Sequence, residues 1–161
     1  MSAAVAGQVQ AHMASLPSTD VGGIGGTLSG NALSLRAMRA TLEHVLTEEA
    51  FDRMLPLANR WASGVKEGIE RFGLTWEVQQ LGARAEYWFC PVPPRTGGEA
   101  AGADDHELSR FTHLYALNRG TLLTPFHNMA LMSPATTGED VDRHTAVFAA
   151  CCAELTGNPE G

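Results

Sequence analysis

Apolar residues recur at steps of three and four along five stretches of this chain, and this spacing predicts amphipathic helices. Asn31, Thr47 and Thr137 are suitable N-caps for three of them, and Asp140 completes a capping box with Thr137. Pro56 interrupts one stretch, so we expect a kink or a late helix start there. The predicted helices cover residues 2–16, 32–47, 48–72, 106–118 and 138–155.

Aromatic and branched residues cluster in residues 74–79 and 84–90, and these two segments are predicted strands. Shorter strands are expected at residues 122–124 and 129–132. The proline- and glycine-rich residues 91–105 predict a mobile surface loop, because neither flank is long enough to fold alone. Together the elements predict an α+β fold in which helices cover a small sheet.

Composition narrows the classes of partner. The 161 residues carry a net charge of −7 and contain no basic cluster, which argues against nucleic acid and anionic membranes as partners. Only 18% of the residues are charged and 44% are hydrophobic, so a further polypeptide could cover part of the surface. No run of about 18 apolar residues and no secretory signal occurs, so we expect no membrane segment.

The three cysteines, Cys90, Cys151 and Cys152, form no C-x-x-C pair, and the six histidines are scattered. We therefore expect neither a disulfide framework nor a bound metal, and a cytoplasmic location.

The glycine-rich residues 22–30 precede a predicted helix, and this arrangement suits an anion. Glycine lets the backbone approach a phosphate closely, and a helix N-terminus attracts negative charge. The segment is neither a Walker A loop, since no lysine follows, nor a G-x-G-x-x-G motif. On spacing alone, a flexible connector between two helices is the stronger interpretation.

Three motifs together resemble class III pyridoxal-phosphate (PLP) aminotransferases. Residues 25–33, GGTLSGNAL, are similar to the G-G-T-x-x-G-N-P-L segment of that family. Residues 120–125, GTLLTP, resemble its late G-V-x-L-x-P strand, and residues 133–142 resemble its S-x-x-H-T-x-x-D-I-D run. Within the family, the chain looks most like glutamate-1-semialdehyde aminomutase and its aminotransferase relatives.

The resemblance implies the C-terminal part of a fold-type I PLP-dependent transferase. Residues 1–31 would be the tail of the large cofactor-binding domain, 32–47 an interdomain helix, and 48–161 the small C-terminal domain. Gly26 and Thr27 would bind the phosphate of the neighbouring subunit's PLP, which implies a homodimer. The implied reaction is transamination of a small amino-acid substrate, or an aminomutase reaction.

The family also needs a lysine that binds the cofactor covalently and an aspartate that contacts its pyridine nitrogen, both located before the glycine–threonine loop. The only lysine here is Lys66, which lies on the polar side of a predicted helix near Glu70. We therefore expect no catalytic residue in this chain and no activity of the chain alone. A subunit of a split aminotransferase and a non-catalytic dimerisation or regulatory remnant remain alternatives.

The segment after Pro125 departs from the aminomutase pattern. It lacks the glutamate expected there and is one residue shorter, which weakens glutamate semialdehyde as the substrate. His127 or Asn128 could face the substrate pocket in its place, or His127 could be an ordinary histidine at a strand end.

Overall fold

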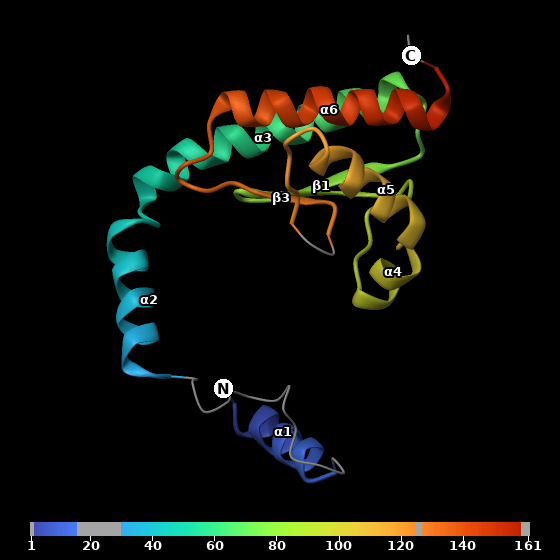
Figure 1. Cartoon of the computed structure of the whole chain (residues 1–161). Helices are drawn as coiled ribbons and strands as arrows, with labels where there is room; N and C mark the ends of the chain where they lie inside the picture. Colours follow the sequence, from blue (N-terminus) through green and yellow to red (C-terminus); the bar gives the residue numbers. More distant parts are fainter. Residues whose placement is uncertain (1, 16–29, 125–126, 159–161) are drawn as a thin grey trace. The chain divides into compact units, whose positions relative to one another are not determined.

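The computed structural model describes residues 2–15, 30–124 and 127–158, and the chain divides into two compact units, Met1–Glu43 and His44–Gly161. The first unit contains α1 (Ala3–Ser15) and nearly all of α2 (Ala32–His44), both of which were predicted (Figure 1). Asn31 caps α2, because its Oδ1 accepts a hydrogen bond of 3.0 Å from the backbone N–H of Ser34. No residue of α2 is buried.

The second unit begins with α3 (Glu48–Arg71), which is capped by Thr47 as predicted. The Thr47 side chain accepts a hydrogen bond of 3.2 Å from the Ala50 N–H. Two glutamates in the first turn stabilise the helix further, because their negative charges lie at the positive end of its dipole. The expected late start is therefore wrong, since α3 begins at Glu48 and contains Pro56. Pro56 is exposed, so its ring lies away from the core.

The sheet has three antiparallel strands in the order β1 (Glu77–Leu81), β2 (Arg84–Trp88) and β3 (Met129–Leu131). Gly82 turns the chain between β1 and β2 with a φ of +59°, a conformation that favours glycine. In the register, Tyr87 is opposite Val78, and Glu86 is opposite Met129.

Two expectations for the connections are wrong. Residues 122–124 form no strand; among the described residues, the N–H of Thr124 reaches the carbonyl of Met129 at 3.4 Å, which does not build a ladder. Residues 91–105 include a short helix, α4 (Gly97–Gly102). The Thr96 side chain accepts from the Glu99 N–H at 3.2 Å, while the Glu99 carboxylate accepts from the Arg95 N–H at 2.7 Å. These reciprocal bonds start a helix within a polar segment.

The remaining helices are α5 (His106–Leu117) and α6 (Gly138–Thr156), and both were predicted. Helix α6 starts with the expected Thr137/Asp140 capping box. Helices α3 and α6 lie side by side along one face of the sheet (Figure 1). The core lies between them and the strands, and its members are Trp61, Val65, Ile69, Ala85, Tyr87, Val141, Phe148 and Cys152.

Candidate functional site

A hollow of about 210 Å³ lies where β2 meets α4, α5 and the segment before β3. Side chains alternate along a strand, so Ala85 and Tyr87 join the core while Glu86 and Trp88 lie on the opposite face. The N–H of Tyr87 donates to the carbonyl of Asn128 at 3.0 Å, which fixes residues 127–128 beside β2. The hollow is lined by Glu86, Trp88, Phe89, Ala100, Ala101, Ala103, Asp104, Ser109, His127 and Asn128.

Glu86 is the buried charge of this hollow. Its side chain is only 6% exposed, and its two oxygens have separate partners. The Arg84 guanidinium donates to Oε2 at 3.0 Å, and His127 Nδ1 lies 3.1 Å from Oε1. Burying a carboxylate is costly unless its oxygens are bonded, so these two half-exposed partners hold Glu86 in place. The carboxylate in turn orients the imidazole of His127.

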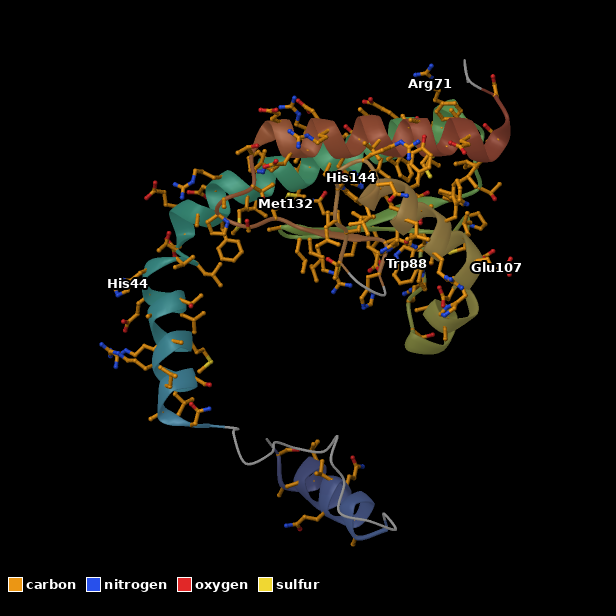
Figure 2. All side chains as sticks on the ribbon, viewed as in Figure 1. His44, Arg71, Trp88, Glu107, Met132 and His144 are labelled. Carbon is orange, nitrogen blue, oxygen red and sulfur yellow. The ribbon has the colours of Figure 1, made fainter. Side chains whose placement is uncertain are left out.

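Two polar atoms beside Glu86 have no hydrogen-bond partner among the described residues. They are Nε1 of Trp88, a donor, and Oδ1 of Asn128, an acceptor, and both are buried. Trp88 is labelled in Figure 2, where it lies on the side of β2 toward α4 and α5. Buried groups of this kind are normally bonded to protein or water, so these two atoms are exceptions in the wall of the hollow.

Only two of the residues singled out in the sequence line the hollow. Gly26 and Thr27 lie outside the described residues. Lys66 is on the exposed side of α3, with its side chain 57% exposed and Nζ 4.0 Å from Glu70, as the sequence suggested. His127 and Asn128, by contrast, both line the hollow.

Sequence reasoning missed Glu86, Trp88 and Asp104. The signal for the first two was the alternation of Arg84, Glu86 and Trp88 along a predicted strand, which places a cation, an anion and an indole on one face. Asp104 could not be placed without knowing that α4 brings it to the hollow.

Among the described residues, no group of three or more histidine, cysteine or acidic side chains could hold a metal ion. None of the helices in the described part of the chain has the length and apolar character that crossing a bilayer requires.

Comparison with known proteins places these features in context. No family model matches the chain. A glutamate-1-semialdehyde 2,1-aminomutase from Sorangium cellulosum is 34% identical over 127 residues, which are 78% of this chain and 28% of that protein. The structure of a glutamate-1-semialdehyde aminomutase from Pseudomonas aeruginosa PAO1, a lysine-to-alanine variant in complex with PMP, matches with a TM-score of 0.76. It is 46% identical and covers 92% of this chain and 34% of its own.

A transaminase with PLP bound shares the fold with a TM-score of 0.65 at 19% identity. The chain thus spans about a third of the length of the relatives it matches, 28% and 34% in the two aminomutases. Its helices and small antiparallel sheet correspond to the C-terminal part of these enzymes.

Proposed function

We propose that this chain is the C-terminal region of a PLP-dependent enzyme. In sequence and fold it matches the C-terminal part of aminotransferases of the glutamate-1-semialdehyde aminomutase type. The enzyme would move an amino group on a small amino-acid substrate. The observation that carries the proposal is the 46% identity over 92% of the chain to the Pseudomonas aeruginosa aminomutase. Residues 1–31, 32–47 and 48–161 would be the large-domain tail, the interdomain helix and the small domain.

PLP, when bound, supplies an electron sink for chemistry at the substrate's amino-bearing carbon. We propose that Gly26 and Thr27 contact its phosphate in a neighbouring subunit of a homodimer, through backbone N–H groups and the threonine hydroxyl. The hollow at Glu86 does not suit the phosphate. Its ionised lining groups, Glu86 and Asp104, would repel a dianion, and no lysine is among its described lining residues.

These 161 residues assayed by themselves should be inactive. Lys66 is exposed and lies near Glu70, so it has neither the burial nor the neighbouring cation that would make it a nucleophile. The lysine that binds PLP would then come from a large-domain region.

The hollow is our candidate for contact with the substrate. It brings His127 and Asn128 together with a buried carboxylate and two unpartnered polar atoms. A broader amino-acid aminotransferase specificity fits this chain at least as well as glutamate semialdehyde, because the glutamate of the aminomutase pattern is missing at residues 127–130.

A chimera tests the proposal. The matching C-terminal third of the Pseudomonas aeruginosa aminomutase would be replaced by this chain, and PLP absorbance and amino-group transfer would be measured. We expect the chimera to bind PLP. Thr27→Val, which removes one hydroxyl donor to a charged phosphate, should weaken PLP binding by about 10-fold or more. Thr27→Ser should retain binding, and Thr41→Val, a matched change in α2, should leave it unaffected.

A folded chimera without PLP binding would contradict the proposal and favour the non-catalytic dimerisation or regulatory remnant. A split aminotransferase makes a different prediction. In that case this chain and a separately encoded large-domain polypeptide should co-purify and regain PLP absorbance, although neither binds PLP alone.

A further inference from the structure

The two ring nitrogens of His127 have different surroundings at the edge of the hollow at Glu86. Nδ1 lies 3.1 Å from Oε1 of Glu86, a side chain that is only 6% exposed. Nε2 forms no hydrogen bond with the described residues, and the His127 side chain is 51% exposed. Because Nδ1 is turned toward a buried group, the accessible edge of the imidazole is the one that carries Nε2. A ligand in the hollow would therefore meet this second nitrogen.

The partners of Glu86 determine which nitrogen of His127 carries the proton. The Arg84 guanidinium donates to Oε2 at 3.0 Å and supplies the counter-charge of an ionised carboxylate. An ionised carboxylate only accepts hydrogen bonds, so Nδ1 of His127 is the donor to Oε1. In the neutral imidazole the other nitrogen then has no proton, and Nε2 is a hydrogen-bond acceptor. The buried carboxylate thus selects one of the two neutral tautomers.

The other groups of the hollow suit a ligand that donates hydrogen bonds. Asp104 adds a second carboxylate, and neither lysine nor arginine is among the described lining residues. Trp88, Phe89 and alanines in and after α4 line the apolar part. A carboxylate on a ligand would meet acceptors and like charges here, whereas a hydroxyl or ammonium group can donate to Nε2 of His127.

We propose that Glu86 is the positioning residue of this hollow and that His127 is its specificity-determining residue. Glu86 holds the proton of His127 on Nδ1, and Nε2 accepts a hydrogen bond from a hydroxyl or ammonium group on the side chain of the substrate. Substrates whose side chain donates are thereby favoured over substrates whose side chain only accepts. The statement about the substrate rests on the proposed function, whereas the statement about the tautomer does not.

NMR of the 161-residue chain with isotope-labelled histidine tests the tautomer, because protonated and bare ring nitrogens give separate signals. The spectrum is recorded at about pH 9, where histidine side chains are ordinarily neutral. The signals of His127 are identified by their loss in His127→Phe. We expect a protonated Nδ1 and a bare Nε2. The opposite tautomer, or a mixture of both, in the wild-type chain would overturn the proposal without any further variant.

Glu86→Gln should reverse the tautomer. Arg84 is a donor only and takes the single acceptor oxygen of the carboxamide, so the amide nitrogen turns toward His127 and Nδ1 must accept. The proton of the neutral ring then moves to Nε2. Asp104→Asn, which makes the same change of charge at the other lining carboxylate, should leave Nδ1 protonated. An unchanged tautomer in folded Glu86→Gln, or a reversed one in Asp104→Asn, would contradict the role of Glu86.

The aminomutase chimera described above tests the substrate. L-homoserine carries a side-chain donor, whereas its O-methyl ether only accepts, and the Kd of each is measured from the change in PLP absorbance. Homoserine should bind more tightly than the ether, and His127→Phe and Glu86→Gln should each reduce this preference about 3- to 10-fold.

The outcomes separate this proposal from the proposed function. A chimera that binds PLP but shows no preference for homoserine, or keeps the preference in both variants, refutes the assignment of His127 as the specificity-determining residue. A folded chimera that binds no PLP refutes the proposed function and the substrate assigned to it. The tautomer is still decided by the spectrum of the chain alone.

Discussion

Gly64 of α3 faces Thr145 of α6 at a contact where an added methyl group would not fit. A Cβ built at Gly64 lies 2.6 Å from Cγ2 and 3.0 Å from Cβ of Thr145. Rotating the Thr145 side chain moves Cγ2 but not its Cβ, so the contact is not relieved by a rotamer change alone. Gly64→Ala should therefore force the two helices apart.

The size of the effect follows from two opposing contributions. Overpacking a well-packed contact costs about 1–3 kcal/mol, while replacing glycine by alanine within a helix gains about 1 kcal/mol. The two contributions leave a net loss of at most about 2 kcal/mol in the free energy of unfolding. We expect Gly64→Ala to lie near that upper value, because rotation does not relieve the 3.0 Å contact with Cβ of Thr145. Ser63→Ala, at an exposed neighbouring position on the same helix, should be neutral or stabilise by a few tenths of a kcal/mol.

Urea unfolding followed by far-UV circular dichroism measures both variants. Thr145→Ser removes Cγ2 and should recover part of the loss when combined with Gly64→Ala, giving a coupling energy of at least about 0.5 kcal/mol in the double-mutant cycle. If Gly64→Ala is as stable as the wild type, or if the cycle shows no coupling, the close approach of α3 and α6 at this position is wrong.

Three further outcomes are expected. Burial lowers the pKa of His144 from 6.5 to about 4, so the unfolded chain binds more protons between these values. The contribution of His144 to the free energy of unfolding should be constant above about pH 6.5 and fall by up to about 3 kcal/mol toward pH 4, and His144→Phe should lack this fall when unfolding is measured across pH. Arg84→Met, which removes one of the two partners of the Glu86 carboxylate, should lower the free energy of unfolding in urea by about 1–2 kcal/mol, and an unchanged midpoint would contradict the role given to this ion pair. Burial raises the pKa of both α6 cysteine thiols to about 12, so iodoacetamide should label only Cys90 in the native protein, as peptide mass spectrometry can check.

Most helices could be predicted because their signals are local. The apolar spacing of α3 and α6 and the caps Thr47 and Thr137 are readable within a few residues. The late start expected at Pro56 was wrong because an exposed proline within a well-capped helix does not delay the start of that helix. The strand expected at residues 122–124 required a pairing partner, and pairing across the sheet cannot be read from one segment.

The candidate site was harder to predict than the fold. His127 and Asn128 were found through their place in a motif, yet their partner Glu86 lies 41 positions away from His127 in the chain. Residues 100–104 reach the hollow through α4. Composition did not reveal this helix, because its start depends on local hydrogen bonds such as the one that the Arg95 N–H donates to the Glu99 carboxylate. Contacts between residues so far apart in the chain form only when the elements pack together, so a local sequence pattern does not reveal them.

The packing of α6 also constrains when the second unit can fold during synthesis. Val141, Phe148 and Cys152 complete a core whose other members come from α3 and the strands. Until the ribosome has released residues up to 152, Trp61 and Tyr87 have no α6 to cover them, and their apolar surface is open to chaperones or to other nascent chains. Contacts between α3 and α6 are also distant in sequence, which slows folding. The second unit should therefore fold only after α6 has left the exit tunnel.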